Sequence, residues 1–147
     1  MWLSRVQRSP MIRPAWTDQD ELMDRPGHPA AIVAENLADL RRVNAILGGV
    51  RLTLAALEDL VGDLGPGAAL SIVDVGTGGG DIPRRAIAWA RSRGLRPTAL
   101  ATDLGLEIVR VAADRRPDLV FAVADGRRLP LRNGAFDVAT CSLVLHH

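Results

Sequence analysis

Residues 70–83 have the sequence LSIVDVGTGGGDIP, in which an aliphatic run leads into three glycines at alternate positions. The aliphatic run predicts a buried strand. Gly76, Gly78 and Gly80 predict a turn whose backbone can come close to a ligand. We expect Asp81 to be the N-cap of the following helix, with Pro83 in its first turn. Because a helix N-terminus offers free N–H groups, the strand, turn and helix together predict a nucleotide-binding site.

The spacing of the three glycines distinguishes between kinds of nucleotide site. Dinucleotide-binding folds use G-x-G-x-x-G, whereas this chain has G-x-G-x-G and places Asp81 where the third glycine would stand. A carboxylate there repels a pyrophosphate but not a cofactor with a cationic end, which weakens the alternative of a nicotinamide-dinucleotide oxidoreductase. The motif resembles that of the class I S-adenosylmethionine-dependent methyltransferases, which often carry an acid where Asp74 stands. A plain glycine-rich turn after a strand is the other interpretation.

Two more acids follow strands predicted further along the chain. Residues 97–102 predict a strand that ends at Asp103, 27 residues after the first glycine of the turn. A carboxylate at the end of the second strand is placed to accept hydrogen bonds from both hydroxyls of a ribose; the alternative is a cap for the next helix. Residues 119–124 predict a third strand that ends in Asp125, and its pair with Gly126 is also typical of an ordinary turn.

The resemblance implies a set of contacts to S-adenosyl-L-methionine. It implies that Leu104 packs on the adenine face, and that Asp125 accepts a hydrogen bond from the adenine amino group with the Gly126 backbone close by. No metal ion is expected. The residues that the resemblance places in the cofactor site are Asp74, Gly76, Thr77, Gly78, Gly80, Asp103, Leu104, Asp125 and Gly126.

The remaining elements complete an α/β fold. Helices are predicted at 29–47, 51–64, 81–93 and 106–116, and a fourth strand at 136–145. We expect Asp137 to tether the loop before this strand, and Cys141 to be a small buried hydrophobe within it. The expected fold is a partial Rossmann-like, doubly wound sheet preceded by N-terminal helices. The resemblance implies strands 3-2-1-4 of a seven-stranded methyltransferase sheet, and implies that the N-terminal helices cover the site.

Three segments are expected along the chain. They are a flexible N-terminal leader at 1–28, a helical segment at 29–66 and the cofactor-binding half of a methyltransferase domain at 67–147. Met1 and Met11 are both candidates for the start of the protein. Because four strands of the seven are predicted, we expect the chain to be part of a longer enzyme, truncated after the fourth strand.

The composition limits the classes of function. A length of 147 residues, 48% of them hydrophobic, predicts one globular domain. A net charge of +1 argues against a dedicated nucleic-acid surface, and a single cysteine argues against a disulfide framework. No apolar run reaches the roughly 20 residues that span a bilayer. No membrane partner is therefore expected, and a cytoplasmic location follows by default.

The candidate catalytic residues are His146 and His147, which follow the fourth strand and are expected to act as a general base or a substrate contact. Structural packing is the alternative. The pattern is most similar to methyltransferases of ubiquinone, menaquinone and polyketide-type pathways, which implies O- or C-methylation of a small-molecule acceptor. A non-catalytic half-domain that binds a cofactor or a partner is the second hypothesis. An exposed fourth strand predicts self-association through its edge.

Overall fold

The structure, a computed structural model, describes residues 32–35, 37 and 48–142. Its centre is a parallel four-stranded sheet in the order β3-β2-β1-β4. This order confirms the expected partial Rossmann-like sheet, and parallel pairing brings the carboxyl ends of its strands to one edge. The strands are β1 (Ala69–Val75), β2 (Arg96–Asp103), β3 (Val120–Val123) and β4 (Val138–Cys141).

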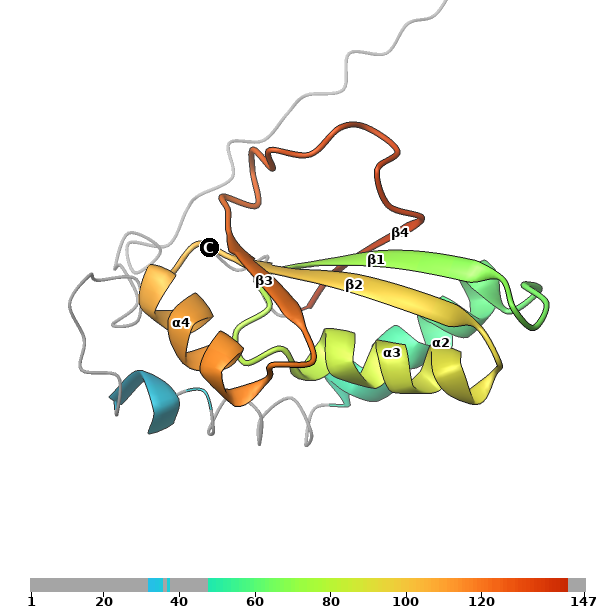
Figure 1. Ribbon diagram of the computed structural model, residues 1–147, viewed down its shortest axis with the longest axis horizontal. Helices are drawn as coiled ribbons and strands as arrows, with labels where there is room; N and C mark the ends of the chain where they lie inside the picture. The colour runs from blue at the N-terminus through green and yellow to red at the C-terminus, as the bar shows by residue number, and fades with distance from the viewer. Residues whose placement is uncertain (1–31, 36, 38–47, 143–147) are drawn as a thin grey trace, which may run out of the picture.

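Three helices lie on one side of the sheet, and the loop from β3 to β4 runs on the other side (Figure 1). α3 packs on β1 and β2, α4 packs on β2 and β3, and α2 lies against α3. None of the helices that the structure describes is long and apolar enough to cross a membrane. The helices are α2 (Gly49–Val61), α3 (Asp81–Ser92) and α4 (Leu106–Arg115).

The main core lies between β1 and α3. Leu70 and Ile72 are two residues apart on β1, so both side chains point to the same face of the sheet. On this helical side they meet Ala86 and Ala90 of α3. The two alanines let the helix come close to the sheet. Leu57 of α2 also belongs to this cluster and is 1% exposed. Burial of this face fixes how α3, and with it the preceding turn, sits on the sheet.

A second, smaller cluster joins the N-terminal part of the chain to α4. Residues 32–35 and 37 are helical, and Val33 and Leu37 pack with Ile108 and Val111 of α4. The remainder of the helix predicted at 29–47 and the leader predicted at 1–28 lie outside the described residues. The observed packing therefore brings part of the N-terminal segment onto the same side of the sheet as α4.

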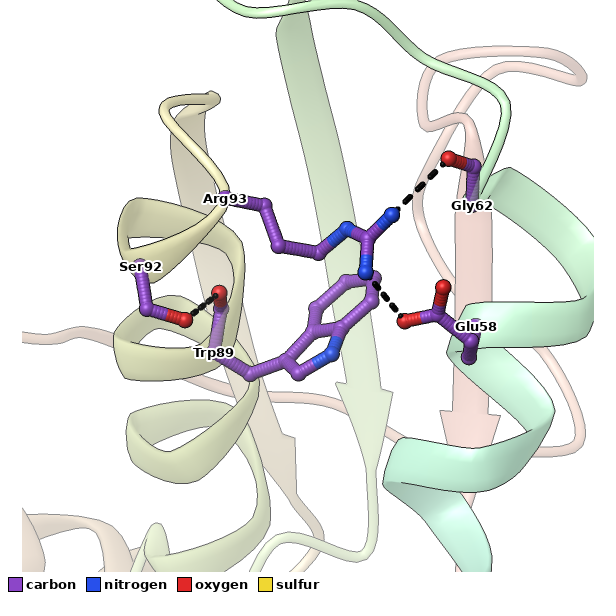
Figure 2. A network of polar contacts seen from close by, with 5 residues as sticks. All are labelled: Glu58, Gly62, Trp89, Ser92 and Arg93. Carbon is purple, nitrogen blue, oxygen red and sulfur yellow. Dashed lines mark hydrogen bonds and ion pairs between the residues drawn. The ribbon is translucent and has the colours of Figure 1, made fainter.

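Arg93, which follows α3, ties this helix to α2 (Figure 2). Its Nη1 donates to Glu58 Oε2 at 2.7 Å, and its Nη2 donates to the carbonyl oxygen of Gly62 at 3.1 Å. The guanidinium carbon also lies 5.6 Å from the centre of the Trp89 ring, within reach of a cation–π interaction. One side chain thus binds the end of α2 and covers an aromatic ring of α3.

The start of β4 is fixed to β1 by a reciprocal contact. Asp137 Oδ2 accepts hydrogen bonds from Ser71 N and Ser71 Oγ, at 2.8 and 2.6 Å. Asp137 N donates back to Ser71, so the predicted role of Asp137 as a tether is confirmed. The prediction that Cys141 is buried was wrong, because the residue as a whole is exposed. Side chains alternate along β4, and the neighbouring Thr140 takes the position that faces Asp74 on the helical side.

Candidate functional site

The turn between β1 and α3 depends on its three alternate glycines. Gly76, Gly78 and Gly80 have φ angles of 66°, 52° and 73°, in the left-handed region that glycine enters without steric cost. Gly80 is also closely packed, because a Cβ there would lie 2.9 Å from Phe121 Cζ and 3.1 Å from Leu119 Cδ1. The glycine spacing therefore encodes both the path of the turn and its contact with β3.

The first residue of α3 differs from the prediction. Gly80 is the N-cap, and Asp81, which we expected to be the cap, is the first residue of the helix. The left-handed φ that completes the turn falls on Gly80, so Asp81 enters the first helical turn, where a negative charge is favourable. Pro83 lies in the first turn as predicted.

Asp103, at the end of β2, faces the glycine turn. Its Oδ2 accepts a hydrogen bond from Gly78 N at 2.9 Å, and its Oδ1 accepts one from Gly105 N at 3.0 Å. Gly105, rather than Asp103, is the N-cap of α4. Each carboxylate oxygen can accept a further hydrogen bond, so the carboxylate keeps acceptor capacity. The structure thus brings together the turn and the acid that the sequence assigned to a ribose.

Asp74 is buried at the end of β1, with a side chain that is only partly satisfied. Thr140 Oγ1 donates to Asp74 Oδ1 at 2.6 Å, while Oδ2 has no hydrogen-bond partner among the described residues. Burial raises the pKa of the Asp74 carboxyl; the Thr140 and Thr77 hydroxyls lower it and the charge of Asp103 raises it. The Thr77 hydroxyl oxygen is also buried, with no hydrogen-bond partner among the described residues.

The end of β3 contributes a glycine and an acid. A Cβ on Gly126 would lie 2.6 Å from Val75 Cγ1, so its backbone packs directly on the end of β1. Asp125 is engaged with Arg127: Oδ1 accepts from Arg127 N at 2.9 Å and Oδ2 from Arg127 Nη2 at 2.9 Å. These contacts lower the pKa of Asp125. The local turn, which was the alternative interpretation of this acid, is therefore present in the structure.

Leu104 follows Asp103 and is 60% exposed. A large apolar side chain in water is unfavourable, and this one stands at the carboxyl edge of β2. The candidate catalytic residues His146 and His147 lie outside the described residues. The structure thus brings the residues predicted at the three strand ends to the same end of the sheet.

The sequence did not indicate two further residues that lie at the carboxyl ends of the strands or contact the glycine turn. Thr140 faces Asp74 because β1 and β4 pair with Asp74 opposite Thr140, and this register is not visible in a single sequence. Arg116 reaches the turn from the end of α4. Its Nη2 lies 2.7 Å from Asp81 Oδ1, and its Nε donates to the carbonyl oxygen of Gly79 at 3.2 Å. Arg116 is one of 18 arginines in the chain, and no local sequence pattern distinguishes it from the others.

Comparison with known proteins identifies the class. The family described as methyltransferase domain matches residues 73–147, the C-terminal half of the chain. The chain belongs to this family, and its strand order is that of the class I S-adenosylmethionine-dependent methyltransferases. No curated protein sequence matches the chain.

Solved structures are similar in fold. A putative S-adenosyl-L-methionine-dependent methyltransferase from Methanococcus maripaludis has a TM-score of 0.51 and 16% identity, over 73% of this chain and 48% of that chain. A TehB-like SAM-dependent methyltransferase from Corynebacterium glutamicum has a TM-score of 0.48 and 23% identity, over 77% and 55%. The YcgJ protein from Bacillus subtilis has a TM-score of 0.48 and 21% identity, over 64% and 37%. The chain spans less than two thirds of the length of each.

Proposed function

We propose that the protein transfers a methyl group from S-adenosyl-L-methionine to a small-molecule acceptor, by O- or C-methylation. The observation that carries the proposal is the hydrogen bond from the glycine turn to Asp103, at the carboxyl edge of the sheet, in a chain of the methyltransferase-domain family. In open α/β sheets, ligands bind outside the carboxyl ends of the strands.

The chemistry of this edge fits the cofactor. Asp74 Oδ2 and Thr77 Oγ1 are buried polar atoms without a partner among the described residues, and such atoms normally have one. S-adenosyl-L-methionine carries a sulfonium and an ammonium group, which an anionic or hydroxyl oxygen attracts. Leu104 presents apolar surface of the kind that a purine covers. The site therefore offers oxygen acceptors to a cation and an apolar face to a base.

Each group then has a specific task. In the proposal Asp103 holds the ribose hydroxyls, Asp74 and Thr77 face the cationic end, and Leu104 packs on adenine. Gly76, Gly78, Gly80 and Gly126 let the backbone come close to the ligand. The adenine amino group would replace Arg127 as a partner of Asp125, and His146 and His147 remain the proposed base or acceptor contacts. The cofactor supplies the methyl group on a positively charged sulfur; the protein positions the reactants and excludes water.

Calorimetry tests which cofactor binds. We expect S-adenosylhomocysteine to give a binding isotherm with the full chain and NADH to give none, because Asp81 stands where a dinucleotide fold requires glycine. Binding of NADH in preference to S-adenosylhomocysteine would overturn the proposal. If the cofactor binds and no acceptor is methylated in a screen of phenols, enols and activated carbons, the non-catalytic half-domain is the better hypothesis.

Asp103→Ala tests the role of the carboxylate. We expect S-adenosylhomocysteine binding to weaken by about 1–3 kcal/mol, because bonds to a charged group are lost. Asp59→Ala is the matched control, since Asp59 is exposed on α2, and it should leave the affinity unchanged. Equal affinities for the native chain and Asp103→Ala, with both folded by circular dichroism, would contradict the ribose role.

The proposal also includes self-association through the edge of β4. Among the described residues this strand pairs with β1 alone, and Ala139 and Cys141 on it are exposed. An unpaired strand edge presents N–H and C=O groups to another strand. A second copy of the chain is the proposed partner.

A further inference from the structure

The glycine turn is held by side chains from two different parts of the chain. From β2, Asp103 Oδ2 accepts the hydrogen bond of Gly78 N at 2.9 Å. From the end of α4, Arg116 donates through Nε to the carbonyl oxygen of Gly79 at 3.2 Å and through Nη2 to Asp81 Oδ1 at 2.7 Å. The bond from Gly78 N to Asp103 and the bond from Arg116 Nε to the Gly79 carbonyl thus hold the N–H group of one turn residue and the C=O group of the next.

The contact made by Arg116 differs from an ordinary surface ion pair. The side chains of Arg116 and Asp81 are 21% and 14% exposed, so solvent screens their charges less than it screens an exposed pair. The guanidinium is a planar group with several donors in fixed directions, which suits simultaneous bonds to a carbonyl and a carboxylate. The two partners also lie 37 and 35 residues away in the sequence. Arg116 therefore connects two separate parts of the fold.

We propose that Arg116 is a positioning residue that holds the glycine turn in the conformation in which the Gly78 N–H group meets Asp103. A fixed Gly79 carbonyl restricts the flexible glycines on either side of it, which otherwise have a wide choice of backbone angles. Asp81 serves as the second attachment point, because its charge is paired with Arg116. The consequence for cofactor affinity rests on the function proposed above, whereas the effect on the turn does not.

Amide hydrogen exchange on the ligand-free full chain tests the effect on the turn directly. In Arg116→Gln we expect the amide of Gly78 to exchange about tenfold faster or more, because its bond to Asp103 opens more often. Arg116→Lys keeps the charge but loses the forked geometry, so it should give an intermediate rate. Arg110→Gln is the matched control, since Arg110 forms an exposed pair with Glu107 on the same helix. Unchanged exchange at Gly78 in a folded Arg116→Gln chain would overturn the proposal.

Cofactor affinity supplies the second readout. We expect Arg116→Gln and Asp81→Asn each to weaken S-adenosylhomocysteine binding by about five- to thirtyfold. The double variant should be no weaker than the weaker single variant, because the two residues act as one unit. A purely structural role would lower the melting temperature and leave the affinity of the folded chain unchanged, and this result would overturn the proposal. If Arg116→Gln does not fold, Asp81→Asn and Arg116→Lys carry the test.

The two proposals fail in different ways. A native chain that binds no S-adenosylhomocysteine, but loses Gly78 protection in Arg116→Gln, contradicts the proposed function and supports the positioning role. A native chain that binds the ligand with the same affinity in all variants, and with unchanged exchange at Gly78, contradicts the positioning role and supports the function.

Discussion

Asp74 illustrates how one buried carboxyl group at the candidate site can lower the stability of the whole fold. Its carboxyl is 1% exposed, and burial raises its pKa above the ordinary value of 3.8. Between these two pKa values the folded chain holds a proton that the unfolded chain has released. The free energy of unfolding therefore falls as the pH rises through this window, and the deficit persists at higher pH.

Asp74→Asn should therefore stabilise the ligand-free chain. An amide keeps the acceptor for Thr140 and adds a donor near the Thr77 hydroxyl, without burying a charge. We expect the free energy of unfolding near pH 7 to rise by about 1 kcal/mol. The gain should shrink as the pH falls below the raised pKa of the native carboxyl, because the carboxyl is then protonated and neutral. Urea unfolding at a series of pH values measures this, and a less stable variant near pH 7 would contradict the interpretation.

Individual residues also show what a single sequence can predict of the site. The position of Asp103 at the end of β2 was predicted correctly because it depends on local signals, a short strand followed by an acid. Arg116 and Thr140 could not be found, because their contacts depend on how the end of α4 lies beside the glycine turn and on how β4 pairs with β1. Cys141 was misjudged for the same reason, since which face of β4 is covered follows from the neighbouring elements. Local chemistry was visible in the sequence, and partners distant along the chain were not.

At the scale of elements, sheet order was predictable and strand ends were less so. The strand expected at 119–124 is paired over Val120–Val123. Of the strand expected at 136–145, residues 143–145 lie outside the described residues, and pairing begins at Val138 rather than at 136. Asp137 bonds Ser71 through its side chain at the point where pairing begins. Hydrophobic alternation continues beyond such a point, so a pattern alone cannot locate it.

The tightness of packing between the glycine turn and β3 can be tested by comparing substitutions at two glycines that have the same φ angle. Gly80 and Gly134 both have a φ of 73°, but a Cβ on Gly80 meets Phe121 at 2.9 Å and one on Gly134 meets nothing within 4 Å. Gly134→Ala should therefore cost only the strain of the left-handed backbone, about 1 kcal/mol. Gly80→Ala adds overpacking and should cost about 2–4 kcal/mol.

Thermal or urea unfolding of both variants separates these two contributions. The difference between their free energies of unfolding measures the contact of the turn with β3, because the backbone strain is common to both. Equal losses in the two variants would indicate that Phe121 moves aside freely. In that case the turn is not held tightly against β3.

At the scale of the whole molecule, the described part of the sheet has two edge strands, each paired on one side only. β3 pairs with β2 and exposes Val120 and Val123, while β4 pairs with β1 and exposes Ala139 and Cys141. The helices α2, α3 and α4 of the described residues lie on one side of the sheet (Figure 1). Burial raises the pKa of the Cys141 thiol, and the charge of Asp74 raises it further, which keeps the thiol protonated near neutral pH. The association proposed at this edge therefore depends on strand pairing rather than on thiol chemistry.

Light scattering during size exclusion tests association through β4. We expect the average mass of the native chain to rise with concentration, because an open strand edge pairs with a second copy. Ala139→Lys places a charge on the strand and should shift the chain toward the monomer, with unchanged circular dichroism. Ala55→Lys makes the same change at an exposed position of α2 and should have no effect. A native chain that stays monomeric at every concentration, or an equal response of both variants, would show that β4 is not the interface.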